Sequence, residues 1–372
     1  MSEFKASGFR DEFGNAGPDL VGITTFTSPY YFVPPSGSTA ERPSNPPPGM
    51  LRFNTDIGRL EVWRNDHWAT ILGESPNLGD QNNTNSSGGT GTRGLFGGGS
   101  PTLDTIDYIT IDTFGDAQDF GNLTDGRNRG GACASRVRGY FLGGLNPGNT
   151  TDMDTVVIAS TGDATDYGNL STSSSLGAAC SNTTRGIHAQ GSPNEAIDYF
   201  VLSSTGSGIS FGSLTDARNR LTAVSNSVRA LFAGGYSPGN VNIIDYVQIP
   251  TTGNAVDFGD LTESKHAVSA AGNSTRGIVA GGTGSALLNT IEFVTITSTG
   301  NAQNFGDLTD AREYTGSCSS PTRMLTAGGL DPSNSNIIDA ITIPTTGNSV
   351  DFGNLSVARM GAAGCSNGHG GL

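Results

Sequence analysis

The chain has 372 residues, of which 34% are hydrophobic, 55 are glycine and 17 are proline. This composition disfavours long helices and favours short strands joined by tight turns. The formal net charge of −14 argues against nucleic-acid binding, which needs clustered Lys and Arg. No apolar run approaches the roughly 18 residues that cross a bilayer, so membrane insertion is not expected. The first residues, MSEFKASGFRDEF, lack the apolar core of a signal peptide, which predicts synthesis and assembly in a cytoplasm.

Residues 1–91 lie outside the repeat that fills the rest of the chain, and they are predicted to form three segments. Residues 1–48 are expected to be an extended arm, because residues 34–49 are rich in proline. Residues 49–73 contain two predicted short strands around the turn Asp56-Ile57-Gly58 and a third strand in WATIL. An element this small cannot bury enough surface to be stable alone, so it is predicted to need a partner or self-association. Residues 74–91 are polar and are predicted to form a flexible linker.

A string DFG-x-L, or a close variant of it, occurs six times in residues 92–372 and determines the predicted fold. Each copy lies 44 or 47 residues after the previous one, and an aromatic residue stands three positions before each leucine. The six leucines are Leu123, Leu170, Leu214, Leu261, Leu308 and Leu355. Such regular spacing indicates a repeat architecture in which each period is one structural unit.

Each period contains four strand candidates. The first is small and apolar, the second begins at an Arg and mostly ends in paired glycines, the third alternates as in IDYVQI at 244–249, and the fourth carries DFG-x-L. Four strands in about 47 residues is the size of one propeller blade.

The two ends of the repeat region are predicted to meet. The first period begins at Thr92-Arg93-Gly94 with its second strand, whereas the last strand candidate, in residues 361–366, has no period of its own. We expect this C-terminal strand to complete the first blade and to close the ring without free sheet edges. The predicted fold of residues 92–372 is therefore an all-β, six-bladed propeller with four-stranded blades.

These repeats resemble the kelch family. A strand ends in Gly-Gly, as at Gly234–Gly235, an aromatic residue precedes a leucine, and an Arg follows that leucine. The chain departs from the kelch pattern where Ser174 and Lys265 replace this Arg, where Ala189-Gln190-Gly191 interrupts a glycine pair, and where Phe or Tyr replaces Trp. The resemblance covers residues 92–366 and implies the fold but no function.

A second resemblance concerns the N-terminal region. Residues 49–68 are similar to a short β element of structural proteins, especially fibres, of tailed bacteriophages. The matching positions are Gly49, Leu51, Arg52, Phe53, Asn54, Thr55, Gly58, Leu60, Glu61, Val62, Trp63 and Trp68. The upstream run GITTFTSPYYFVPPSGSTAERP also resembles the leader of cyanophage-type virion proteins. The resemblance implies a particle-bound protein that contacts other virion proteins through residues 1–72 and is oligomeric in the particle.

Residues that commonly carry chemistry form no recognisable site in this sequence. Cys133, Cys180, Cys318 and Cys365 recur at the repeat spacing and are predicted to be small buried thiols in separate blades, without disulfides. The four histidines do not pair in sequence; His188 is expected at an ordinary strand position and His369 in a frayable tail. No Trp follows residue 68, and Gly-x-Ser-x-Gly, Walker and His-Glu-x-x-His motifs are absent. We therefore predict no catalytic, cofactor-binding or metal-binding residues and no enzymatic activity.

An acidic residue recurs in the third strand of every period. These residues are Asp107, Asp154, Asp198, Asp245, Glu292 and Asp339. A ring of carboxylates is one way to bind calcium, but recurrence in all six periods favours a structural ion pair or hydrogen bond. The predicted partners are the arginines that begin the second strands, at 93, 138, 185, 229, 276 and 323.

Binding is instead predicted where the periods differ. The loops between the second and third strands vary most, at residues 100–105, 145–152, 192–196, 236–242, 283–289 and 330–336. They are expected to share one edge of the propeller and to suit carbohydrate or protein contact. The resulting expectation is a bacteriophage virion structural protein that displays a propeller for host-surface or virion-protein binding. The alternatives are a non-viral kelch-type interaction module and a propeller enzyme that acts on glycans.

Overall fold

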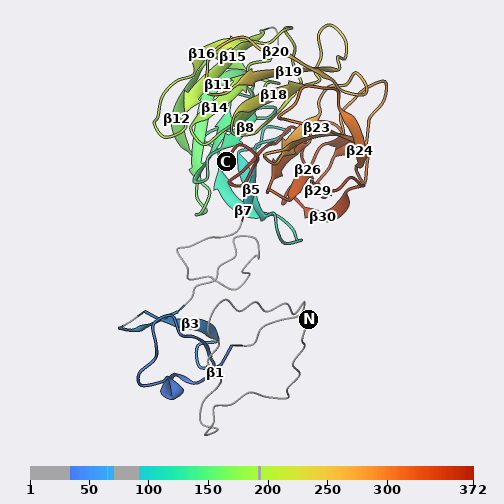
Figure 1. The fold of residues 1–372 in the computed structure, drawn as a ribbon. Helices are drawn as coiled ribbons and strands as arrows, with labels where there is room; N and C mark the ends of the chain where they lie inside the picture. The colour runs from blue at the N-terminus through green and yellow to red at the C-terminus, as the bar shows by residue number, and fades with distance from the viewer. Residues whose placement is uncertain (1–33, 65, 71–91, 192–193) are drawn as a thin grey trace. The chain divides into compact units, whose positions relative to one another are not determined.

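The computed structural model describes residues 34–64, 66–70, 92–191 and 194–372 and is almost entirely β (Figure 1). The chain divides into two compact units, Met1–Gly73 and Glu74–Leu372. The one short helix in the described residues is the 3-10 turn η1 (Thr39–Glu41). No helix in these residues is long and apolar enough to span a membrane. The predicted linker and most of the predicted arm lie outside the described residues.

The N-terminal unit contains one four-stranded sheet in the order β1 (Ser36–Gly37), β2 (Leu51–Asn54), β3 (Arg59–Trp63) and β4 (Trp68–Thr70). The predicted hairpin is present, because β2 and β3 pair antiparallel on either side of the turn that ends at Gly58. Gly58 has a φ of +63°, a conformation that glycine adopts with little strain. Part of the predicted arm is not merely extended, since β1 pairs parallel to β2 and η1 follows it.

The buried residues of this N-terminal sheet are polar. Arg52, Asn54 and Glu61 are buried, and Arg42 forms an ion pair with Glu61. In the described residues 34–70, no Ala, Val, Leu, Ile, Met, Phe, Tyr or Trp side chain is fully buried. The hydrophobic effect, which is the main favourable term in folding, therefore contributes little inside this sheet.

Residues 92–372 form six sheets, each with four antiparallel strands. Sheet 1 contains β31 (Ala363–Ser366), β5 (Arg93–Gly97), β6 (Thr105–Thr110) and β7 (Gln118–Asn122). Sheet 2 contains β8 (Gly131–Ala134), β9 (Arg138–Leu142), β11 (Gly148–Val157) and β12 (Thr165–Ser174), with the short β10 (Leu145–Asn146) paired to β11. Sheet 3 contains β13 (Ala178–Ser181), β14 (Arg185–Ala189), β15 (Ala196–Val201) and β16 (Ile209–Ser213).

The remaining three sheets repeat the same pattern. Sheet 4 contains β17 (Thr222–Ser225), β18 (Arg229–Ala233), β19 (Ile243–Gln248) and β20 (Val256–Asp260). Sheet 5 contains β21 (Ser269–Gly272), β22 (Arg276–Ala280), β23 (Thr290–Thr295) and β24 (Gln303–Asp307). Sheet 6 contains β25 (Gly316–Ser319), β26 (Arg323–Ala327), β29 (Ile337–Thr342) and β30 (Val350–Asn354), and β27 (Leu330–Asp331) pairs with β28 (Ser333–Asn334) beside it. The four strands predicted for each period are therefore present, in a blade-like, propeller-like arrangement.

The C-terminal strand adds to the sheet that begins near residue 92. β31 pairs antiparallel with β5, with Ala363 opposite Gly97 and Ser366 opposite Gly94. The first strands of neighbouring sheets also contact one another in the order β8, β13, β17, β21, β25 and β31, and β31 contacts β8.

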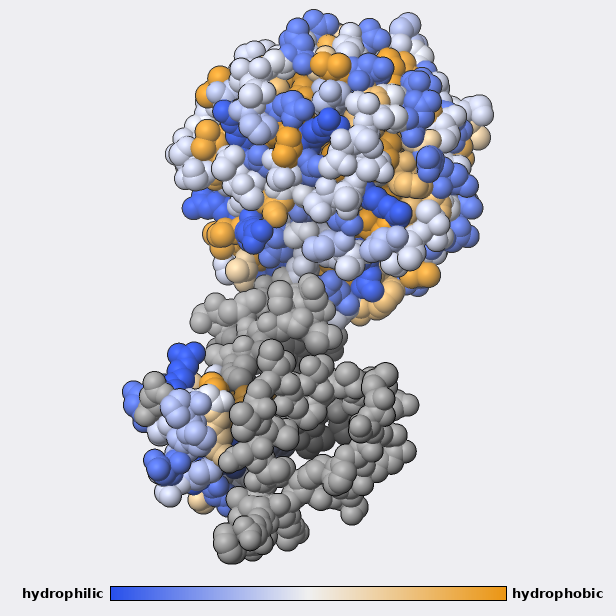
Figure 2. All heavy atoms as spheres, in the orientation of Figure 1, coloured by the Kyte–Doolittle hydropathy of each residue, from blue (hydrophilic) through white to orange (hydrophobic). Residues whose placement is uncertain are grey.

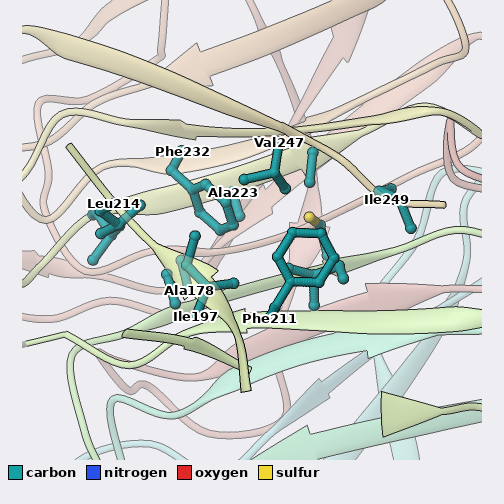
Figure 3. Close-up of a cluster of buried hydrophobic side chains, with 13 residues drawn as sticks. Ala178, Ile197, Phe211, Leu214, Ala223, Phe232, Val247 and Ile249 are labelled. Carbon is teal, nitrogen blue, oxygen red and sulfur yellow. The ribbon is translucent and has the colours of Figure 1, made fainter. Parts of the chain in front are cut away.

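Apolar side chains fill the space between successive sheets. In the cluster shown in Figure 3, Ile197 and Phe211 of sheet 3 pack with Phe232 and Val247 of sheet 4. Phe211 and Leu214 are the aromatic residue and the leucine of one DFG-x-L string, and both are buried. Full burial of a Leu or Phe side chain contributes about 1.5–3 kcal/mol. The recurring string is therefore explained by packing between sheets.

The recurring acidic residue has a different partner from the predicted one. It forms a buried ion pair with the Arg or Lys that follows the DFG-x-L leucine, in five of the six sheets. The pairs are Arg127–Asp154, Arg218–Asp245 at 2.8 Å, Lys265–Glu292 at 2.8 Å, Arg312–Asp339 at 2.8 Å and Arg359–Asp107 at 2.9 Å.

Strand register explains this correction. In sheet 4, Arg229 lies opposite Gln248, whereas Phe232 lies opposite Asp245. Three residues along a strand separate the predicted partners by about 10 Å. The second-strand arginine instead reaches the next sheet, where Arg229 Nη1 donates to the carbonyl oxygen of Ile296 at 3.0 Å.

Candidate binding site at the channel mouth

The segments that connect one sheet to the next each contain a residue in the left-handed backbone region. We call these six the rim residues, and their φ angles lie between 54° and 67°. They are Arg129, Leu176, Arg220, Ala267, Tyr314 and Gly361. A residue other than glycine costs roughly 1–2 kcal/mol in this conformation. Five of the six positions nevertheless carry a side chain, so the backbone alone does not explain the residue types.

The backbones of the rim residues form a cycle of hydrogen bonds. Each N–H donates to the carbonyl oxygen of the rim residue of a neighbouring sheet, at 2.7–2.9 Å. The donors and acceptors follow the order Arg129 to Gly361, Gly361 to Tyr314, Tyr314 to Ala267, Ala267 to Arg220, Arg220 to Leu176 and Leu176 to Arg129. The rim is therefore held by the six sheets together.

The rim surrounds a hollow that we call the mouth. It contains about 410 Å³ of empty space, open solvent included. Next to it, a channel is lined by small residues of the first strands, among them Ala132, Ala179, Ala223 and Ala270. Leu221, Val268 and Thr315, each next to a rim residue in the chain, also line the mouth.

Two rim arginines lie at the mouth without a carboxylate partner. The guanidinium carbon of Arg129 lies 4.8 Å from the ring centre of Tyr314, and that of Arg220 lies 5.5 Å from the ring centre of Tyr236. The Nε atoms of both arginines are buried without a hydrogen-bond partner. Within the described part of the chain, no Asp or Glu forms a salt bridge with either arginine.

His266 fixes the position of Arg220. Its Nδ1 lies 2.7 Å from Asn240 Oδ1, and its Nε2 lies 3.2 Å from Arg220 Nη1. A neutral ring that donates through Nδ1 and accepts through Nε2 satisfies both contacts. Burial and the charge of Arg220 lower the pKa of His266, and the carboxylate of Glu313 opposes this shift. The imidazole therefore stays uncharged beside the guanidinium near neutral pH.

Tyr314 and Glu313 complete the polar chemistry of the mouth. Burial raises the pKa of Tyr314, so its hydroxyl remains a hydrogen-bond donor. Glu313 accepts a hydrogen bond from Thr283 Oγ1 at 2.6 Å. The lining of the mouth thus includes two guanidinium groups without a carboxylate partner and a phenol, with the neutral His266 and the carboxylate of Glu313 beside them. This set can bind an oxyanion and hydroxyl groups together.

The loops predicted to bind lie at the same end as the rim. Tyr236, in one of these loops, exchanges backbone hydrogen bonds with Asn219 beside the rim, and its side chain is 40% exposed. Neighbouring loops also contact each other, since Asn240 Nδ2 donates to the carbonyl oxygen of Gly284 at 2.8 Å. Residues 192–193 of the third loop lie outside the described residues.

The C-terminal residues occupy the opposite end of the channel. His369 Nε2 lies 2.9 Å from the carbonyl oxygen of Ala134 and 3.2 Å from Ser181 Oγ. Arg136 Nη2 donates to the carbonyl oxygen of Leu372 at 3.0 Å. The prediction of a frayable tail at His369 is therefore wrong, because its imidazole hydrogen-bonds to sheets 2 and 3.

The other residues that the sequence highlighted lie apart from the mouth. The four cysteines are free and buried, and burial raises the pKa of Cys180 and Cys365 to about 12, which makes the thiols unreactive. His188 is buried in β14, and burial lowers its pKa to about 4. The described residues contain no group of three His, Cys, Asp or Glu side chains placed to hold a metal ion.

On the face of residues 92–372 visible in Figure 2, apolar residues are scattered among polar ones. No protein family profile matches the chain, and no curated protein matches it significantly.

Proposed function

We propose that this chain is a non-enzymatic structural protein of a tailed-bacteriophage particle. In this proposal, residues 1–72 attach it to other virion proteins. Sheets 1 to 6 are the blades of a closed, six-bladed, kelch-like β-propeller that binds a host-surface glycan or protein, or another virion protein. The chain would be assembled in the host cytoplasm and be oligomeric in the particle.

Two sets of hydrogen bonds support the closed propeller. The pairing of β31 with β5 joins the end of the chain to the sheet that begins near residue 92. The backbone cycle through the rim residues links all six sheets at one end. A closed arrangement explains both, because in a ring the last strand lies beside the first sheet and each rim residue lies beside that of the next sheet.

The observation that carries the binding role is the pair of unpaired arginines at the mouth. Elsewhere in residues 92–372, the buried cations that follow the DFG-x-L leucines have a carboxylate partner. Arg129 and Arg220 have none in the described residues, and their backbones are in a conformation that favours glycine. Backbone strain of this kind is typical of functional positions.

The N-terminal sheet supports attachment. Side chains alternate between the faces of a strand, so Leu51, Phe53, Leu60 and Val62 share one face of β2 and β3, opposite the buried Arg52. None of these four apolar side chains is fully buried, and Leu51 is 37% exposed. This face belongs to the stretch that resembles phage fibre elements, and its burial against a partner would supply the missing apolar core.

Incorporation into particles tests the proposal. The wild-type chain should be found by mass spectrometry in purified phage particles, and Leu51→Asp should reduce its incorporation at least 10-fold. Ile57→Asp is the matched control, because Ile57 is a 46% exposed apolar residue in the turn, away from the β2–β3 face. If the wild-type chain is missing from particles, or if both variants are lost equally, the proposed attachment is wrong.

A further inference from the structure

We propose that the mouth is a binding site for an acidic sugar residue, with Arg129 and Arg220 holding its anionic group. This inference rests on the proposed binding role of the propeller, but it does not depend on where the protein is located. It names the ligand class of the mouth as a saccharide that carries a carboxylate or phosphate group.

The charges of the molecule point to an anionic group. The chain has a formal net charge of −14 and only 20 Lys and Arg residues. Five of these cations pair with buried carboxylates between the sheets, whereas two guanidinium groups border one hollow without a carboxylate partner. A guanidinium offers a planar fork of N–H donors that matches the oxygens of a carboxylate or phosphate.

The two guanidinium groups are already oriented. Arg129 packs on the ring of Tyr314, and Arg220 packs on the ring of Tyr236 and donates to His266. Their backbones belong to the cycle of hydrogen bonds through the rim. A ligand therefore loses little affinity to the ordering of these side chains.

The remaining groups favour a sugar over a polyanion. The charge of Glu313 acts on His266 and Tyr314 beside the mouth, so it disfavours a ligand with many negative charges. Tyr314 lines the mouth and keeps its hydroxyl proton, and Leu176 and Leu221 add apolar side chains to the lining. A ligand with one anionic group, several hydroxyl groups and a ring matches this combination, whereas nucleic acid and polyphosphate do not.

Isothermal titration calorimetry with the full-length protein tests the inference. The ligands are methyl glucuronide, glucose 6-phosphate and the neutral methyl glucoside. At least one of the two anionic sugars should bind at least 10-fold more tightly than the neutral one, and its affinity should fall as salt increases. Comparison of the two anionic sugars shows which oxyanion the mouth prefers.

Glycine variants of the two rim arginines test the role of their charges while keeping the fold. Arg129→Gly and Arg220→Gly place the residue favoured by a left-handed backbone, so the variants should fold, which circular dichroism checks. Each should weaken binding of the anionic sugar at least 10-fold, and the double variant should abolish it. Arg136→Gly removes one positive charge at the opposite end of the channel, where Arg136 Nη2 donates to the carbonyl oxygen of Leu372, and this variant should bind as the wild type does.

Three outcomes would overturn the inference. They are equal affinity for the neutral glucoside, an equal loss in Arg136→Gly, and binding of an acidic peptide in place of either anionic sugar. If the sugars do not bind but the purified protein still blocks adsorption of particles to host cells, the inference fails and the proposed function stands. If the chain is missing from particles while the anionic sugar binds, the proposed location fails and the ligand assignment stands.

Discussion

Sheet 3 differs from the other five sheets in the side chains that hold its recurring buried acidic residue. In sheet 4, Arg218 donates through Nε to the carbonyl oxygen of Gly234 at 2.9 Å and through Nη1 to Asp245 at 2.8 Å. In sheet 3, Ser174 occupies the position of this arginine, and its hydroxyl donates to the carbonyl oxygen of Gln190. Gln190 in turn donates through Nε2 to Asp198 at 2.7 Å. Two neutral side chains thus make the counterparts of two of the hydrogen bonds that Arg218 makes.

This difference shows what the recurring acidic residue does. In all six sheets its carboxylate accepts a backbone N–H from the residue that follows the DFG-x-L leucine, as Asp245 does from Thr215 at 3.2 Å and Asp198 from Ser171 at 3.0 Å. The cation is present in only five sheets. The acid therefore anchors the chain where it crosses between sheets, and the cation serves to neutralise the acid.

The largest effect is expected from removing the cation in a regular sheet. Arg218→Ala leaves Asp245 buried without its counter-charge, and breaking a buried pair in this way costs about 3–5 kcal/mol. Gln190→Ala removes only a neutral donor to Asp198, a change that costs about 1–3 kcal/mol. Urea unfolding of both variants measures the difference as a shift of the midpoint. An equal cost in the two sheets would mean that the charge of Arg218 has no special role.

A loss of stability at low pH, of similar size, is expected from His188 in sheet 3. His188 is buried in β14, where sheets 5 and 6 have Val279 and Thr326. Burial lowers its pKa from 6.5 to about 4, with Asp198 opposing the shift. The unfolded chain therefore binds more protons than the folded chain between these pH values, and stability falls as the pH decreases from about 6.5 to about 4. The loss from this group reaches about 3 kcal/mol.

His188→Val isolates this contribution. Chemical unfolding between pH 4 and 7 should show a smaller loss of stability in the variant than in the wild type. Burial also lowers the pKa of His266 and of His369, so part of the pH dependence should remain. Identical profiles for variant and wild type would contradict the assignment of this proton uptake to His188.

The sequence predicted the strands of residues 92–372 well, because their signals are local and recur six times. The DFG-x-L string marks a buried aromatic residue and a buried leucine in every sheet, and such periodicity is independent of the path between sheets. The partner of the acid was predicted wrongly, because it depends on strand register. No residue pattern shows that Arg229 lies opposite Gln248 while Asp245 faces the crossing segment.

The mouth was not predicted, although the sequence contains a signal for it. The rim residue stands two positions after the recurring Arg or its replacement, and the six residues there are Arg, Leu, Arg, Ala, Tyr and Gly. We predicted binding only from the variation of the loops between the second and third strands, and not from the variation at this position. The left-handed backbone and the hydrogen-bond cycle arise from contacts between neighbouring sheets, so no single period shows them.

The smallest expected effect concerns the coupling between Ser174 and Gln190. Because the two side chains together replace one arginine, changing either alone should be worse than changing both. Ser174→Arg places a long cation where the side chain of Gln190 donates to Asp198, and Gln190→Gly removes that donor. In the double variant, the new arginine can reach Asp198 as Arg218 reaches Asp245. A double-mutant cycle by urea unfolding should give a favourable coupling of about 1–3 kcal/mol.

A distant pair provides the control for this cycle. Ala267→Gly changes a rim residue that contacts neither Ser174 nor Gln190 by hydrogen bond, so its effect should add to that of Ser174→Arg within about 0.5 kcal/mol. Additivity of Ser174→Arg with Gln190→Gly as well would mean that the two residues of sheet 3 are independent substitutions. Coupling confined to the close pair would instead show that Ser174 and Gln190 replace the buried cation together, keeping the anchoring role of Asp198.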